Sequence, residues 1–199
     1  MTEKENTIID KYGCWIYDKI MKIAVFSDSH GDKESMKKFI DMLNPEIVLF
    51  LGDGIDDIRQ LEDYYPKLRF DYVKGNTDLT NDVPNNKSLI IEGVSIFLTH
   101  GNNYGINKFS YDTKKITECA LENKASIFLH GHAHTPTLWI NKGITFMNPG
   151  TVKSNPEKGC PTCGLIYTYD TYFICKILFL DFLSFYEHDI GHRKKESIS

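Results

Sequence analysis

The chain has 199 residues, which is enough for one domain with a substantial core. Apolar residues make up 41% and charged residues 25%, a balance that excludes a disordered chain and a membrane-spanning class. The formal charge of -4 leaves no basic excess, so nucleic acid is not an expected partner. Five cysteines, an odd number, and a polar, acidic start predict no disulfide framework, no secretory signal and a cytoplasmic location.

Residues 1–20 show no clean periodicity, and we interpret them as an extension. A single domain over 21–183 and a polar tail over 184–199 are predicted to follow. Apolar runs at 22–27 and 46–51 predict strands that are covered on both faces. A third strand is predicted at 69–73, and segments with helical spacing separate the three. Strand alternating with helix is typical of a doubly wound parallel sheet.

The second half of the chain has a different pattern. Paired apolar segments joined by turn residues predict hairpins over 88–98, 137–147 and 163–180. Between the first two hairpins, 111–123 has helical spacing and 126–129 reads as a short buried strand.

Polar side chains with metal-ligand chemistry stand where five of the predicted strands end. In open parallel sheets, ligands bind beyond the carboxyl ends of the strands, so we expect these side chains to share one crevice. An extended backbone would also point Asp28 and His30 to the same side, and likewise His132 and His134. In chain order the set is Asp28, His30, Asp53, Asn76, His100, His132 and His134.

Seven nitrogen and oxygen ligands are too many for one transition metal and suit two divalent cations. The Asp53 carboxylate is placed to bridge cations about 3.5 to 4 Å apart, the spacing of two-metal phosphoesterases. A donor set without thiolate favours manganese, which we expect first, or zinc, iron, nickel or cobalt.

Each local motif also has a simpler explanation. Asp28, Ser29 and His30 before Gly31 read as a turn and helix cap, and Asn76 and Asp78 read as turn residues. His100 alone reads as a histidine at a strand edge. These simpler explanations would all have to hold at once, so we favour the metal site.

The full set also carries a family resemblance. The order Asp28-x-His30, Gly52-Asp53, Gly75-Asn76, His100 and Gly131-His132-x-His134 resembles the calcineurin-like metallophosphoesterase superfamily. With Asn148-Pro149-Gly150, the stretch from Met21 to about Tyr169 is similar to its small single-domain bacterial and archaeal phosphodiesterase branch. The resemblance implies an α/β fold with a two-sheet β-sandwich flanked by helices, in four layers (α/β/β/α). It would put Asp28, His30, Asp53 and His134 on one metal, and Asp53, Asn76, His100 and His132 on the other.

The resemblance implies a metal-dependent phosphodiesterase acting on small-molecule phosphate diesters, in which a hydroxide held between the metals attacks phosphorus in line. Asn76 and Asp78 are the expected catalytic residues. Larger members carry a histidine after the Gly-Asn motif, where this chain has Thr77-Asp78, and many of the small branch have a histidine where it has Asn102. Both departures remove a proton donor, and protonation of the leaving group contributes about 10² to 10⁴-fold.

Other readings stay open. A protein of the same fold serves mainly as a binding platform, so the alternative function is a metal-binding interaction scaffold with little or no catalytic activity. A nuclease is disfavoured by the acidic balance, no membrane partner is expected, and a homo-oligomer is allowed.

The remaining cysteines and histidines have weaker signals. Cys160-Pro161-Thr162-Cys163 is a lone C-x-x-C, and zinc needs four ligands, so we interpret it as a structural loop. Cys14, Cys119 and Cys175 read as small apolar fillers. His188 and His192 lie in the polar tail and are expected to be solvated.

Overall fold

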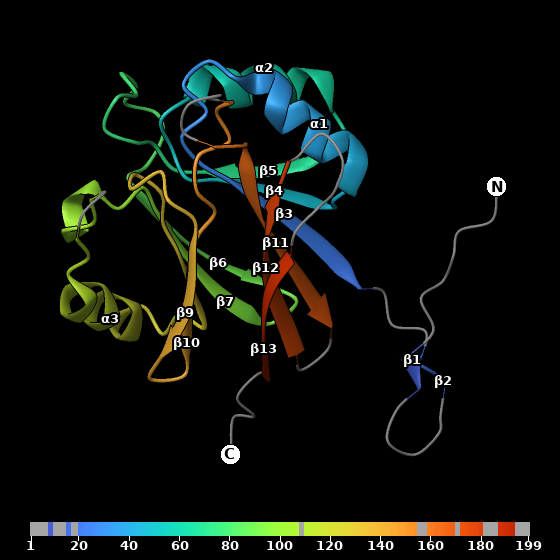
Figure 1. Cartoon of the computed structure of the whole chain (residues 1–199), viewed down its shortest axis with the longest axis vertical. Helices are drawn as coiled ribbons and strands as arrows, with labels where there is room; N and C mark the ends of the chain where they lie inside the picture. Colours follow the sequence, from blue (N-terminus) through green and yellow to red (C-terminus); the bar gives the residue numbers. More distant parts are fainter. Residues whose placement is uncertain are drawn as a thin grey trace.

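The computed structural model describes residues 8–9, 15–16, 20–107, 110–154, 159–169, 172–180 and 187–193. Two mixed sheets pack face to face, and helices cover their outer faces (Figure 1). The six-stranded sheet has the order β13 (Glu187–Arg193), β12 (Tyr172–Phe179), β11 (Thr162–Tyr169), β3 (Met21–Phe26), β4 (Ile47–Phe50) and β5 (Arg69–Tyr72). The five-stranded sheet has the order β6 (Asn86–Ile91), β7 (Val94–Thr99), β8 (Ile127–Leu129), β10 (Ile144–Asn148) and β9 (Thr137–Asn141).

Successive side chains of a strand point to opposite faces of the sheet, and this divides the core into layers. On β3, Ile23 and Val25 point into the cluster between the two sheets, whereas Ala24 and Phe26 point to the opposite face. The opposite face packs against α1 (Lys33–Leu43) and α2 (Ile55–Tyr64). Beyond the five-stranded sheet, a third cluster lies under α3 (Thr113–Glu122). The two-sheet sandwich flanked by helices, in the order α/β/β/α, is therefore confirmed.

The helices begin where side-chain caps are available. Asp32 accepts a hydrogen bond from the Ser35 N–H at the start of α1, and Asp112 accepts one from the Lys115 N–H of α3. The start of α2 has no cap from its own Gly54, and the carboxylate of Asp78 takes this role. A short 3₁₀ turn, η1 (Asn102–Tyr104), follows β7.

The expectation of a doubly wound sheet is wrong. The strands β3, β4 and β5 are parallel and follow one another across the sheet in chain order. Because connections between parallel strands are right-handed, both α1 and α2 then lie on the same face of the sheet. Figure 1 shows these two helices side by side over that face. The other face is free to pack against the second sheet, which explains why β3 and β4 are apolar on both sides.

The chain ends differ in part from the prediction. Residues 187–193, assigned from the sequence to a polar tail, form the strand β13, which pairs antiparallel with β12. Backbone pairing does not require apolar side chains on an edge strand, so composition alone missed it. Near the start, β1 (Ile8–Ile9) and β2 (Trp15–Ile16) pair with each other. The side chains of His188 and His192, and all of Cys14, lie outside the described residues, so those expectations stay predictions.

Within the described part of the chain, no helix is both long and apolar enough to cross a membrane.

Candidate metal centre

The seven predicted ligand residues lie on loops at one edge of the sandwich. These loops follow β3, β4, β5, β7 and β8, so segments more than a hundred residues apart in the chain meet there. The structure brings all seven side chains together, in two groups that share a carboxylate: Asp28, His30, Asp53, Asn76, His100, His132 and His134.

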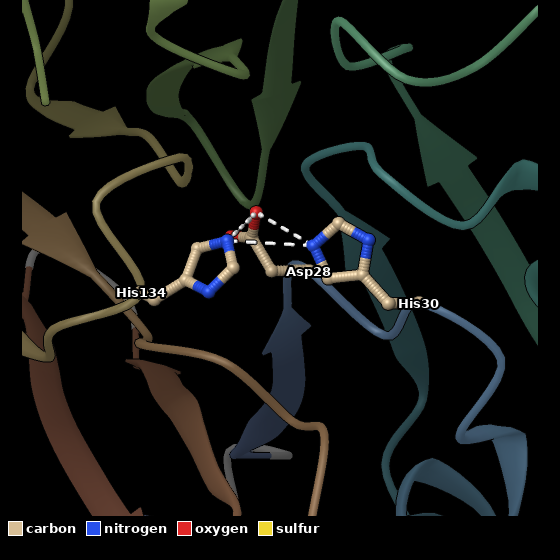
Figure 2. Close-up of side chains that lie close together, drawn as sticks. All are labelled: Asp28, His30 and His134. Atoms are coloured by element: carbon tan, nitrogen blue, oxygen red, sulfur yellow. Dashed lines mark hydrogen bonds and ion pairs between the residues drawn. The ribbon is translucent and has the colours of Figure 1, made fainter. Parts of the chain in front are cut away.

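The first group consists of Asp28, His30 and His134, shown in Figure 2. The Oδ1 of Asp28 lies 3.2 Å from the Nε2 of His134 and 3.9 Å from the Nε2 of His30. The two imidazole nitrogens are 3.4 Å apart. Asp28 is fully buried whereas the side chain of His134 is 46% exposed, so this group has an acidic floor and an open side.

The second group is arranged around the Nε2 of His100. This nitrogen lies 3.1 Å from Asn76 Oδ1, 3.2 Å from His132 Nδ1 and 3.5 Å from Asp53 Oδ2. Four potential ligand atoms thus converge, and none of them is a thiolate.

Asp53 connects the two groups. Its Oδ2 lies 3.5 Å from the Nε2 of His100 and 3.9 Å from the Nε2 of His30. Asp28 is shared as well, because Asp28, Asp53 and His100 form a second triad whose ligand atoms lie within 4.8 Å of one another.

Backbone N–H groups orient both carboxylates toward the histidines. Asp28 Oδ2 accepts a hydrogen bond from the His132 N–H at 3.1 Å, and Asp53 Oδ1 accepts one from the Thr77 N–H at 2.9 Å. The second oxygen of Asp28, Oδ1, is buried and has no hydrogen-bond partner among the described residues. A buried carboxylate oxygen without a donor is costly unless a cation compensates it, so these residues fit a divalent metal.

His100 is held in the tautomer that a metal requires. Its Nδ1 lies 2.8 Å from the carbonyl oxygen of Leu51, and a carbonyl only accepts, so Nδ1 carries the proton and donates it there. When the ring is neutral, Nε2 carries the lone pair on the side that faces Asp53 and Asn76. Hydrogen bonds of this kind fix the orientation of metal-ligating histidines.

The charges of the site perturb its ionisable groups. Burial alone would raise the pKa of Asp53, but the hydrogen bond and charge of His100 lower it well below its ordinary range. Burial opposes protonation of His100, yet Asp53 and Asp28 raise its pKa. Burial and the neighbouring His100 lower the pKa of His132. The carboxylates therefore attract positive charge into the centre.

The backbone reaches this geometry in a way that the sequence did not predict. Extended segments were expected to align Asp28 with His30 and His132 with His134. Instead, these four residues and Asp53 have positive φ angles, between 42° and 67°. Left-handed backbone is uncommon for residues other than glycine and is concentrated at functional sites.

The carboxylate of Asp78 lies beneath the ligand loops. One oxygen accepts hydrogen bonds from the N–H groups of Asp53 (2.7 Å) and Gly75 (2.8 Å), and the other accepts from Gly54 (2.9 Å) and Ile55 (3.0 Å). Both oxygens are thus engaged with backbone donors. This arrangement points to a role of Asp78 in holding the loops, whereas the sequence predicted a catalytic role.

Other residues that sequence reasoning did not select also shape the site. Asp57 accepts hydrogen bonds from the Ser29 hydroxyl (2.6 Å) and the Gly31 N–H (2.8 Å) and so fixes the loop after β3. The Thr151 hydroxyl donates to the carbonyl of Asp28 at 2.7 Å. Asn148, quoted above only as part of a motif, donates to the Gly131 carbonyl at 3.0 Å.

None of the four described cysteines contributes a ligand to the two groups. Cys160 is exposed beside the centre and Cys163 is buried in the core under α1 and α2. Cys175 is buried between the sheets and Cys119, on α3, is partly buried, as expected for apolar fillers. All four described cysteines are free thiols.

The chain belongs to the calcineurin-like phosphoesterase superfamily, whose domain model matches residues 21–171. Among curated proteins it is similar to a probable metallophosphoesterase, YsnB, of Bacillus subtilis, with 28% identity over 134 residues, 67% of this chain and 76% of that protein. A probable metallophosphoesterase of Mycoplasma pneumoniae is 25% identical over 146 residues, 72% of this chain and 88% of that protein.

Solved structures show the same fold. A predicted phosphoesterase from Streptococcus pneumoniae superposes with a TM-score of 0.67 and 25% identity, covering 87% of this chain and 99% of that one. Vps29 from Entamoeba histolytica in complex with zinc gives a TM-score of 0.69 at 21% identity, covering 86% and 99%. The fold is therefore common to predicted phosphoesterases and to Vps29.

Proposed function

We propose that this protein is a metal-dependent phosphodiesterase that uses two divalent cations. The observation that carries the proposal is the position of Asp53 Oδ2, which lies 3.9 Å from a nitrogen of the first group and 3.5 Å from a nitrogen of the second. A carboxylate between two sets of nitrogen and oxygen donors is what a pair of bridged cations requires.

The residues present define which groups would hold the metals. Asp28, His30 and His134 with Asp53 would hold one cation, and Asn76, His100 and His132 with Asp53 would hold the other. When bound, divalent cations activate water and stabilise negative charge on a phosphoryl group. Mixed oxygen and nitrogen donors suit manganese, our first expectation, and also zinc, iron, nickel or cobalt. The zinc complex of Vps29, a protein of the same fold, supports keeping zinc among the candidates.

The residues around the centre would position the substrate, but they offer little acid catalysis for the departure of the leaving group. A cavity of about 660 Å³ adjoins the centre and is lined by His30, His132 and His134 as well as Thr151 and Lys153. It has room for both substituents of a diester, with Lys153 available for a phosphate oxygen. Asp78 is engaged by backbone donors, and no carboxylic acid is found among the described lining residues of this cavity to protonate the departing alkoxide.

The rival function is a metal-binding interaction scaffold. The likeness to Vps29 keeps this candidate open, because a shared fold does not establish a shared activity. The two functions differ in turnover and agree in metal content, so both quantities must be measured.

The test begins with purified protein stripped of metal by a chelator and then reloaded with manganese or zinc. We expect reloading to restore hydrolysis of bis(p-nitrophenyl) phosphate. The Asp53→Asn variant should lose both metals and the activity, whereas Asp63→Asn, an exposed position in α2, should keep both. A protein that binds two metals yet hydrolyses neither diesters nor monoesters would support the scaffold instead.

A further inference from the structure

A second cavity continues the one at the metal centre. The metal-side cavity, described above, has Pro136 and Phe179 in its wall. The same two residues line a neighbouring apolar groove of about 440 Å³ between β9 and β12, whose other lining residues are Thr137, Leu138, Trp139 and Ile177. The two spaces therefore adjoin at Pro136 and Phe179.

The two cavities differ sharply in chemistry. Lys153 and three histidines line the metal-side cavity, and no acidic side chain does so among its described lining residues. This end suits an anion. The apolar groove has no charged lining residue, and the hydroxyl of its one polar residue, Thr137, is buried. The wall of the groove thus offers hydrocarbon and aromatic surface, with almost no polar group that could form hydrogen bonds with a hydrophilic substituent.

We infer that the apolar groove is the subsite for one ester substituent of the substrate, and that this substituent is an extended hydrocarbon chain. The inference rests on the proposed phosphodiesterase function. Pro136 and Phe179 line both cavities, so a phosphate held at the metal centre would have the groove within reach of one of its substituents. The groove beside a cavity that suits an anion favours an amphiphilic diester over a nucleotide, because a nucleobase would find few hydrogen-bond partners there.

The first test uses a series with a constant leaving group. Alkyl p-nitrophenyl phosphates from methyl to octyl, kept below their micelle concentrations, differ only in the retained chain. Burial of a methylene is worth a factor of about four in affinity when it is complete. We expect kcat/KM to rise by roughly twofold to fourfold per methylene, mainly through KM, until the groove is filled.

A matched pair of variants locates the effect. Leu138 lines the apolar groove, whereas Ile140, two residues along the same strand, is 41% exposed and lies outside that lining. Leu138→Asn should flatten the dependence of kcat/KM on chain length, and the longest esters should lose the most. Ile140→Asn should keep the dependence of the unmodified protein.

A binding measurement covers the case in which Leu138→Asn fails to fold. In the unmodified, metal-loaded protein, n-alkylphosphonates should inhibit more strongly as their chain lengthens, by the same factor per methylene. Turnover of the methyl ester with no dependence on chain length in either assay overturns the inference and leaves the phosphodiesterase proposal intact. Absence of any turnover, even of the methyl ester, counts against the phosphodiesterase proposal itself. A chain-length effect that Ile140→Asn removes and Leu138→Asn preserves would also overturn the assignment of the groove.

Discussion

Asp78→Asn separates a structural role of Asp78 from a catalytic one. The carboxylate accepts four backbone hydrogen bonds, from Asp53, Gly54, Ile55 and Gly75. An asparagine has the same shape, but its amide nitrogen cannot accept. Two of the four hydrogen bonds would be lost, and the side-chain NH₂ of the asparagine would face two backbone N–H groups.

The size of the effect follows from those bonds. A hydrogen bond to a charged acceptor contributes about 1.5 to 3 kcal/mol, and partial exposure of Asp78 favours the lower end. Losing two should therefore reduce the free energy of unfolding by about 3 to 4 kcal/mol. For a chain of this size, about 1 kcal/mol changes Tm by roughly 2 to 4 °C, so we expect a fall of about 5 to 15 °C.

Thermal unfolding followed by circular dichroism, with chelator present so that metal binding does not contribute, checks this expectation. The control is Asp63→Asn, which should change stability by less than about 0.5 kcal/mol because its side chain is exposed. An Asp78→Asn protein as stable as the original but without activity would refute the structural role and support the catalytic role that the sequence predicted for Asp78.

Three further predictions concern the substrate cavity and the cysteines. Lys153→Gln should raise KM by roughly tenfold or more and change kcat little, because it removes the cation that lines the cavity and would contact a bound phosphate. Steady-state kinetics will show this, with Lys67→Gln, which changes an exposed lysine, as the control. Aryl diesters should react much faster than alkyl diesters, with a steep dependence of kcat on the leaving-group pKa; a flat dependence would reveal a general acid. Cys160→Ser should leave metal content and stability unchanged because Cys160 is exposed. Cys163→Ser should lower the free energy of unfolding by about 1 to 3 kcal/mol because it buries a hydroxyl. Metal analysis and denaturant unfolding of both variants check these two outcomes.

The sequence was most informative where a strand ends. The apolar runs before Asp28, Asp53 and Asn76 indicated parallel strands, and parallel strands align their carboxyl ends, so convergence of the polar residues followed from topology. The two-sheet arrangement came from the family resemblance instead. Periodicity alone suggested helices on both faces of one sheet. A periodic apolar pattern indicates that a face is buried, but it does not indicate whether a helix or another sheet covers that face.

The contacts between loops lay beyond sequence reasoning. The left-handed backbone at His132 and His134 depends on the packing of neighbouring loops, and no local signal marks it. The role of Asp78 was missed for the same reason, since its partners at Asp53 and Gly54 are distant in the chain. The strand β13 was missed because its pairing is carried by the backbone.

The bridging position of Asp53 is the central claim, and anomalous X-ray scattering from crystals grown with manganese tests it most directly. The account predicts two anomalous peaks per chain, about 3.5 to 4 Å apart, with the Asp53 carboxylate between them. One peak should lie against His30 and His134, and the other against Asn76 and His100. A single peak, or two peaks that the Asp53 carboxylate does not join, would contradict the account.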